Sequence, residues 1–419
     1  MVMVLTTLMK GLLLVTVVGP SLAMGLFGTS SMAAGALVVS LVYVCISIAS
    51  WGHAWPRKIL VPWAVVTFFG TGILYLHSSY GFSTDSAFDF ARFWQSHLLL
   101  ILYSLGAYCF VILARRVSAK QADGSIKFVF WALILSAIAG IARFSPFFPA
   151  AAFKSVLFYG EPSHFALDFL PLLLCMVVRS QGRKKLVLLI GSLALFLMLE
   201  NLTLLVGFAL IFCLTVRPRR LLLLPLLPFV AFLALQLTDL EYYAERLDFS
   251  SSASNLSSLV YMSGLERSHL NLVETGGLGV GFQQFGIVGS MGDGQELIAA
   301  LIGQEANLLD GGSVAQKFIG EFGILGVLAV LLYFRYFLRS ANWLIRESHT
   351  LGNQSDPRDV FFHSCFAIYA IDLLIRGTGY FSSSGFVFVA ALYWLFLKPI
   401  RSAWRSPMTA SLPATSQCG

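Results

Sequence analysis

Three ionisable side chains near the start of one apolar run could carry acid–base chemistry. The stretch "FYGEPSHFALD" spaces Glu161, His164 and Asp168 by three and then four residues, which places them on one face of a helix. Pro162 suits the first turn of that helix, so Glu161 is expected at its mouth. Partial removal from water there would raise the pKa of Glu161 toward the range of a general base. Glu161 is therefore the candidate base and His164 its alternative, although Glu161 could simply cap the helix and His164 could simply pack.

A second group combines cationic side chains with a glycine-rich run. The stretch "LERSHLNLVETGGLGVGFQQFG" contains Arg267 and His269, followed by glycines that include Gly279 and Gly281. Glycine lets the backbone approach a ligand closely and exposes N–H groups. The pattern predicts that Gly279 and Gly281 shape a binding site that Arg267 or His269 faces. The alternative is an amphipathic helix over 259–274 and a tight loop, both lying on a membrane surface.

Long apolar runs must position these groups. The 419 residues are 57% hydrophobic and 12% charged, with a mean hydropathy of +0.79, whereas soluble domains carry about 25% charged residues. Many runs approach the ~20 residues that cross a bilayer as a helix. The sequence therefore predicts an all-α polytopic integral membrane protein. The apolar runs are 11–27, 32–50, 59–76, 97–114, 128–144, 163–178, 186–216, 221–238, 318–338, 360–375 and 385–397.

Short basic loops between the runs indicate their orientation. The positive-inside rule places such loops in the cytoplasm, and the alternation then puts both termini there and keeps the first run as a helix. The basic sequence pI of about 9.1 follows from this orientation signal, without nucleic acid as a partner. The residues concerned are Lys10, Arg57, Lys58, Arg115, Arg116, Lys120, Lys127, Arg179, Arg183, Lys184, Lys185, Arg217, Arg219, Arg220, Arg335, Arg339, Arg346, Arg358, Lys398, Arg401 and Arg405.

The run 186–216 breaks the alternation because basic patches flank both of its ends. As one helix it would be about 46 Å long and would carry one patch outward, while two full spans need about 40 residues. A hairpin of two short membrane helices that turns at "LENLT" (199–203) resolves the conflict. The prediction is then about ten full transmembrane helices and one short hairpin.

The predicted organisation has four parts. Residues 1–238 hold transmembrane helices, including the hairpin, and 239–317 form a large periplasmic loop. Residues 318–397 hold the last transmembrane helices, and 398–419 form a cytoplasmic tail. The glycine-rich run falls in the outer loop and lacks the strand context of a dinucleotide motif, so no nucleotide is expected there.

Several basic residues remain on the outer side, against the positive-inside trend. A guanidinium presents a rigid fork that matches phosphate oxygens, so these residues suit an anionic ligand. No carboxylate cluster or cysteine spacing suggests a metal, so the cations could take its place at a diphosphate. Local pairing is the alternative, as for Lys317 with Glu321 and Arg376 with Asp372. The outer residues are Arg92, Arg143, Lys154, Arg246, Arg267, Lys317 and Arg376.

Three motifs together resemble the bacterial O-antigen polymerase/ligase superfamily. They are "GEPSHFA" at the start of a span, "GGLGVGFQQFG" in the large loop and "SVAQKFIGEFGILGVLAVL" entering a late span. The resemblance covers roughly residues 150–340. It implies a GT-C-like fold and transfer of a saccharide from undecaprenyl diphosphate at the outer face of the inner (plasma) membrane, without metal or other cofactor. Ligases of this superfamily usually carry a histidine where this chain has Ser313, which favours a polymerase.

The predicted function is therefore that of an O-antigen or exopolysaccharide polymerase. Glu161 would activate the acceptor hydroxyl, with His164 or His269 as alternatives. The diphosphate would be held by Arg143, Arg267 and Arg376, and next by Arg246 and Lys317. The implied partners are an undecaprenyl-diphosphate-linked oligosaccharide, membrane lipid, a chain-length regulator and a flippase. The alternatives are an O-antigen ligase, a flippase or transporter of lipid-linked sugar, and a structural subunit of a membrane complex.

Overall fold

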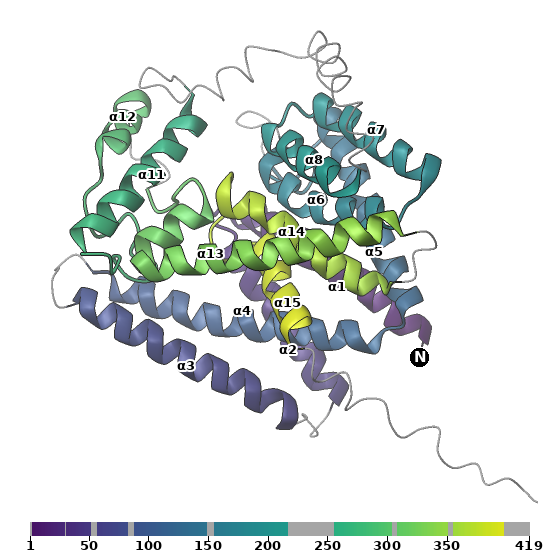
Figure 1. Ribbon diagram of the computed structural model, residues 1–419, viewed down its shortest axis with the longest axis horizontal. Coiled ribbons are helices and arrows are strands. Elements are labelled where there is room, and N and C mark those ends of the chain that lie inside the picture. The colour runs from purple at the N-terminus through teal and green to yellow at the C-terminus, as the bar shows by residue number, and fades with distance from the viewer. Residues whose placement is uncertain are drawn as a thin grey trace, which may run out of the picture.

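The protein is all-helical in the part described by the computed structural model (Figure 1). The described residues are 2–29, 31–51, 57–82, 88–148, 155–216, 255–303, 308–350 and 355–397. These ranges contain no β-strand, and their β-structure is limited to isolated β-bridges. The helices are α1 (Val2–Phe27), α2 (Ala33–Trp51), α3 (Arg57–Phe82), α4 (Phe90–Arg116), α5 (Ala119–Ile141), α6 (Pro162–Val178), α7 (Gly182–Met198), α8 (Leu202–Thr215), α11 (Leu256–Glu274), α12 (Asp293–Ile302), α13 (Val314–His349), α14 (Pro357–Leu374) and α15 (Ser383–Phe396).

Hydrogen bonds between distant segments gather one set of helix ends together. At the start of α14, Arg358 Nη1 donates to the carbonyl of Val117, just beyond α4, at 2.7 Å. Gln181, at the start of α7, donates to the carbonyl of Thr350, at the end of α13, at 3.0 Å. We call this side of the bundle the basic end, because Arg115, Arg179, Lys185 and their basic neighbours lie in the same turns.

The opposite helix ends meet at what we call the loop end. Here Gln284 Nε2 donates to the carbonyl of Asp89, at the start of α4, at 3.1 Å. Arg376, beyond α14, pairs with Glu161, before α6, at 2.8 Å. In Figure 1 α3, α4 and α13 run across the view, and α11 and α12 lie at its left side. Successive helices of the bundle therefore alternate in direction, as the basic loops predict.

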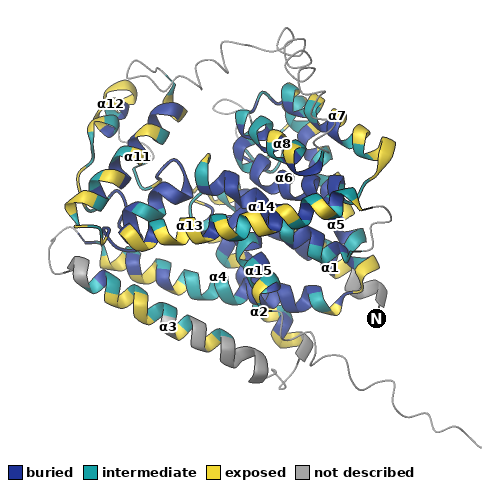
Figure 2. Cartoon of the chain, viewed as in Figure 1, coloured by how far each residue is buried: buried dark blue, intermediate teal, exposed yellow. Residues whose placement is uncertain are grey.

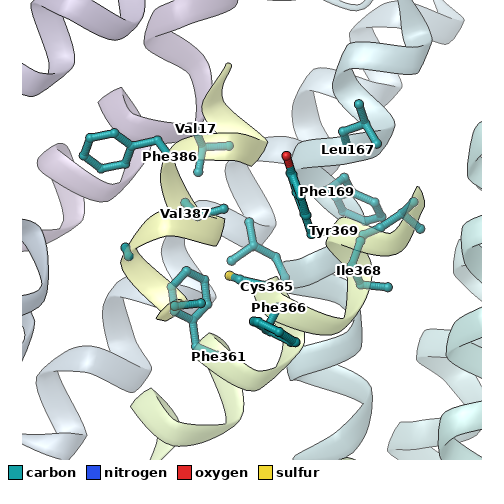
Figure 3. Packing of buried hydrophobic residues seen from close by; sticks show 14 of the residues in the cluster. Val17, Leu167, Phe169, Phe361, Cys365, Phe366, Ile368, Tyr369, Phe386 and Val387 are labelled. Carbon is teal, nitrogen blue, oxygen red and sulfur yellow. The ribbon is translucent and has the colours of Figure 1, made fainter. Parts of the chain in front are cut away.

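The centre of the bundle is built from α6, α14 and α15. Nearly every side chain of α6 is buried, and Phe165 stacks on Phe169 with ring centroids 5.2 Å apart. Figure 3 shows side chains from the three helices meeting in this core, among them Leu167, Cys365 and Val387. A helix that is apolar on all sides is typical of such a buried position.

Other helices expose apolar side chains instead. Leu98 of α4, Leu135 of α5 and Leu331 of α13 are each more than half exposed. Figure 2 shows such exposed stretches along α3, α4 and α13. Large exposed apolar surfaces mark contact with a membrane or a partner. The fold is that of a helical membrane protein.

The number of spans differs from the sequence prediction. Within the described residues, four helices are long and apolar enough to cross a membrane, namely α1, α4, α5 and α13. The apolar helices α6, α8 and α15 have only 17, 14 and 14 residues. Counting about ten full spans is therefore wrong for this structure, because apolar runs also arise from burial inside the bundle. The run 221–238 lies outside the described residues.

The run 186–216 folds as two helices, α7 and α8. The chain turns at Glu200, which has a left-handed φ of 47°. Asn201 caps α8 by accepting the Leu204 N–H at 3.0 Å. At the other end, Lys185 Nζ donates to the carbonyl of Thr215 at 2.6 Å and so joins the start of α7 to the end of α8. Both ends of the hairpin therefore lie at the basic end of the bundle.

Candidate functional site

An ion pair at the loop end brings together two predicted site residues. Glu161 is the N-cap residue of α6, but its side chain makes no capping hydrogen bond. Its Oε2 instead accepts from Arg376 Nη2 at 2.8 Å and from the Ser163 hydroxyl at 2.9 Å. The interpretation of Glu161 as a mere helix cap is therefore wrong, because its side chain makes no capping hydrogen bond and pairs with Arg376 instead.

The pKa of Glu161 is shifted downward, not upward as the sequence suggested. Burial raises this pKa, but His164, Arg376 and the hydrogen bonds from Ser163 and Arg376 outweigh the burial and leave it below the usual 4.5. The predicted increase is wrong because the neighbouring guanidinium could not be read from the local sequence. Glu161 is held as a carboxylate, which positions Arg376 and can accept a proton once that pairing weakens.

Arg376 keeps capacity for an anionic ligand. Its side chain is 29% exposed, and one N–H group is engaged by Glu161. A guanidinium has five N–H donors, so others can reach phosphate-type oxygens from the loop side. The predicted local pairing with Asp372 does not form. Asp372 accepts the Thr378 N–H at 3.0 Å and bonds the hydroxyls of Thr378 and Ser384.

His164 lies one turn into α6, beside this pair. Its Nδ1 is buried and has no hydrogen-bond partner among the described residues. Burial lowers the pKa of its imidazole from 6.5 to about 4, with Glu161 and Asp310 acting against this shift and Arg376 adding to it. The third residue of the predicted face, Asp168, turns into the core and accepts the Ser383 hydroxyl at 2.6 Å. Of the three residues on the predicted helix face, Glu161 and His164 therefore lie at the loop end, whereas Asp168 lies in the core.

Asp310 is a member of this cluster that sequence reasoning missed. It is exposed, and a Cβ built on Gly379 would lie 3.9 Å from its Oδ1. Next to it, the Gly377 N–H donates to the carbonyl of Gly312 at 2.9 Å, which ties the loop after α14 to the loop before α13. The only local signal was an acidic residue before two glycines. We refer to Glu161, His164, Asp310 and Arg376 as the loop-end cluster.

Arg267 and Lys317 donate hydrogen bonds to the main chain of the loop that carries Asp310. They are 2% and 4% exposed. Arg267 Nη1 donates to the carbonyl of Leu308 at 2.6 Å, and Lys317 Nζ donates to that of Leu309 at 2.8 Å. Both were predicted to bind substrate directly. In the structure their charged groups are engaged by main-chain oxygens, so they hold residues 308–310 in place.

Aromatic rings complete the surroundings of these two cations. The guanidinium of Arg267 lies 4.7 Å from the centre of the Phe285 ring, and the ammonium of Lys317 lies 5.3 Å from that of Tyr380. Tyr380 in turn donates its hydroxyl to Glu321 Oε2 at 2.8 Å. The predicted pairing of Lys317 with Glu321 is therefore mediated by Tyr380 rather than by a direct ion pair within the described residues.

The glycine-rich run makes main-chain hydrogen bonds to α13 at a break in that helix. Gly323 inside α13 has φ 56° and ψ −130°, which interrupts the helix. The Gly281 N–H donates to the carbonyl of Glu321 at 2.9 Å, and the Ile324 N–H donates to that of Gly277 at 2.8 Å. These bonds satisfy main-chain groups that the break would leave unpaired.

Gly279 shows why glycine is needed in this run. Its φ is 82°, and a Cβ there would lie 2.5 Å from the carbonyl oxygen of Glu321 and from the nitrogen of Gly323. Its own N–H donates to Thr275 Oγ1 at 2.7 Å. The sequence predicts that the backbone at Gly279 and Gly281 approaches a ligand closely. The backbone that approaches is that of α13, and the N–H groups of Gly279 and Gly281 are already engaged.

Among the described residues, neither His269 nor Arg143 makes a hydrogen bond or ion pair with the loop-end cluster. His269 is exposed on α11, while Arg267 on the same helix is buried. Arg143 is exposed just after α5, with a left-handed φ of 55°. Arg246 lies outside the described residues.

Searches with this chain find no matching family model, no similar curated protein and no similar solved structure. Assignment of a function therefore depends on the fold and on the loop-end cluster. These define a helical membrane protein with a cluster of titratable side chains at one end of its bundle.

Proposed function

We propose that the protein is a polysaccharide polymerase. It transfers a growing glycan from undecaprenyl diphosphate to the sugar of a second lipid-linked repeat unit. The observation that supports this most directly is the ion pair between Glu161 and Arg376, which are 215 residues apart and meet beside His164. The pair combines a carboxylate suited to proton transfer with a guanidinium suited to a diphosphate.

In the proposed reaction, an acceptor hydroxyl attacks the anomeric carbon of the donor sugar. The new carbon–oxygen bond forms as the bond from that carbon to the diphosphate oxygen breaks. The hydroxyl proton passes to the Glu161 carboxylate, and the electron pair leaves with the diphosphate. Arg376 stabilises the charge that develops on the leaving group. As Arg376 turns toward the diphosphate, Glu161 loses part of its pairing and becomes a better proton acceptor.

The proposed setting is the bacterial inner membrane. The loop end would face the periplasm and the basic end the cytoplasm, with both termini cytoplasmic, because basic residues gather in the turns of the basic end. A flippase would supply the lipid-linked repeat units, and a chain-length regulator would act on the product. The proposal also includes a GT-C-like arrangement of the helices, which the resemblance to the superfamily implies.

The test is complementation of a strain that lacks the gene, read by gel analysis of its surface glycan. We expect the deletion strain to carry single repeats on lipid, and we expect Glu161→Gln and Arg376→Ala to reproduce that pattern. Glu296→Gln, which changes an exposed carboxylate on α12, is the matched control and should restore long chains. Membrane levels of each variant must equal those of the unchanged protein.

Other glycan patterns would overturn the proposal. Polymer that accumulates on its lipid carrier without reaching its acceptor would identify a ligase. Repeats trapped on the cytoplasmic side would identify a flippase. Normal chain lengths in both site variants would remove Glu161 and Arg376 from the chemistry, as expected of a structural subunit.

A further inference from the structure

Beyond its first turns, which bury Leu259 and Val260, helix α11 has mainly polar side chains inside and several apolar side chains outside. Its buried face carries Ser263, Arg267 and Asn271, which are 3%, 2% and 1% exposed. Its opposite face carries Met262 and Val273, which are 41% and 62% exposed. A helix that packs on a protein surrounded by water does the reverse, with apolar residues inward and polar residues outward.

The exposed apolar positions form one stripe. Met262, Leu265, His269 and Val273 follow spacings of three and four residues, so they lie on one face of the helix. Leu265 is 44% exposed, and His269, the polar member of the stripe, is also exposed. We call these four residues the α11 stripe.

One of the two carboxylates of α11 borders this stripe, because Glu266 lies four residues after Met262 and three before His269. Glu266 accepts the N–H groups of Asp293 at 2.9 Å and Gly294 at 2.8 Å, at the start of α12. Glu274 accepts the Ser290 N–H at 3.2 Å. Both acidic side chains are therefore hydrogen-bonded to main-chain N–H groups in the segment before and at the start of α12.

The stripe continues into the apolar surface of a membrane-length helix. Leu278, just beyond α11, is 51% exposed, and Ile324 of α13 is 57% exposed. A Cβ built on Gly277 would lie 2.8 Å from Ile324 Cδ1, so this loop touches the exposed face of α13. Leu325 and Leu328 extend the same exposed face along α13. The surface that would face lipid on α13 therefore reaches the end of α11.

The direction of α11 fits a position in the membrane interface. In Figure 1 α11 runs steeply across the view, whereas α4 and α13 lie nearly horizontal. A helix that crosses the direction of the spanning helices is not aligned to span the membrane with them. Interfacial helices bury one apolar face at the boundary of headgroups and acyl chains.

We propose that α11 is an interfacial helix whose stripe rests on membrane lipid while its other face holds Arg267 inside the protein. The occupant of the stripe is the lipid bilayer itself. The inference requires a membrane around the bundle but not the proposed glycosyl transfer. It also assigns His269 to the lipid-facing side, away from the loop-end cluster.

The test uses an environment-sensitive fluorophore on single cysteines in protein reconstituted into lipid nanodiscs. The six native cysteines are replaced by alanine, and Leu265→Cys and Val273→Cys report on the stripe. Leu328→Cys on α13 is the lipid-facing reference, and Ser257→Cys, exposed but off the stripe, is the matched control on α11. Each variant is checked for an unchanged elution volume.

We expect labels at 265 and 273 to emit at short wavelength, as at 328, and to be quenched several-fold more by spin-labelled lipid than by iodide. The label at 257 should show the opposite preference. Iodide quenching at 265 and 273 equal to that at 257 would show that water covers the stripe. Short-wavelength emission with no quenching by either agent would show that a second copy or another protein covers it. Either result would overturn the proposal.

Discussion

At the scale of single residues, the loop-end cluster depends on which carboxylate pairs with the guanidinium of Arg376. Arg376 has Asp372 four residues before it on the same stretch of chain, yet it pairs with Glu161. Asp372 is already satisfied by Thr378 and by serine and threonine hydroxyls. Local spacing therefore predicted the wrong partner for Arg376, because tertiary contacts override weak helical pairs.

The lowered pKa of Glu161 predicts a pH-dependent contribution to stability. A carboxylate whose pKa is lower in the folded state stabilises the fold above its unfolded pKa, and the effect is lost as pH falls through the folded pKa. Thermal unfolding in detergent should therefore separate the unchanged protein from Glu161→Gln at neutral pH. The gap should begin to narrow as the pH falls below the usual 4.5 and should close once the pH is below the lowered pKa of the folded protein.

The size of that gap should be modest. The two side chains are 29% and 36% exposed, and partly exposed ion pairs contribute about 0.2–1 kcal/mol. Lys127→Met, which removes an exposed ion pair with Asp123 at the basic end, is a control for loss of a surface charge pair. A gap that persists unchanged to pH 3 would show that Glu161 does not carry its charge in the folded protein.

At the scale of elements, the glycine-rich run and the break in α13 form one unit. Gly281 and Ile324 exchange main-chain hydrogen bonds across it with Glu321 and Gly277. The run also reaches α4, because Asp89 N and Gln284 Oε1 are 2.9 Å apart. This unit sets the angle at which α13 leaves the loop end, and with it the position of Lys317.

A single methyl group should disturb this unit at one glycine and not at another. Gly279→Ala places a Cβ 2.5 Å from two backbone atoms of α13 and forces an alanine to adopt φ 82°. Gly276→Ala also has a positive φ, of 60°, but its Cβ would meet nothing within 4 Å. Strained backbone alone costs about 1–3 kcal/mol. We expect Gly279→Ala to lower the midpoint of thermal unfolding clearly more than Gly276→Ala, and equal effects would contradict the contact with α13.

At the scale of the whole molecule, the sequence predicted the alternation of helices better than their number. Basic patches mark helix ends directly, which is why the hairpin of α7 and α8 could be placed from charge alone. An apolar run does not distinguish a membrane-spanning helix from a buried one, because lipid and a protein core favour the same side chains. The helices α6 and α15 are apolar since they are buried in the bundle. Asp310 could not be predicted because only the fold brings its loop to α6.

The alternation makes a prediction about the two ends of the bundle. In a cysteine-free background, Glu296→Cys on α12 reports on the loop end, and Lys127→Cys, at a side chain that is 52% exposed, reports on the basic end. Position 296 should react with a membrane-impermeant thiol reagent in cells whose outer permeability barrier alone is opened. Position 127 should react only after the inner membrane is also made permeable, because the basic turns should be retained in the cytoplasm.

The pattern of labelling tests both the orientation and the separation of the two ends. If 127 reacts first and 296 only after full permeabilisation, the bundle is inverted, and the loop-end cluster would face the cytoplasm, where no lipid-linked polymer is assembled in the proposed reaction. If both react under the same condition, the two ends are not separated by a membrane at all. The alternation seen in the hydrogen bonds from Arg358 to Val117 and from Arg376 to Glu161 would then describe a bundle that does not span. Only protection of 127 together with reactivity of 296 leaves the loop-end cluster where a periplasmic transfer requires it.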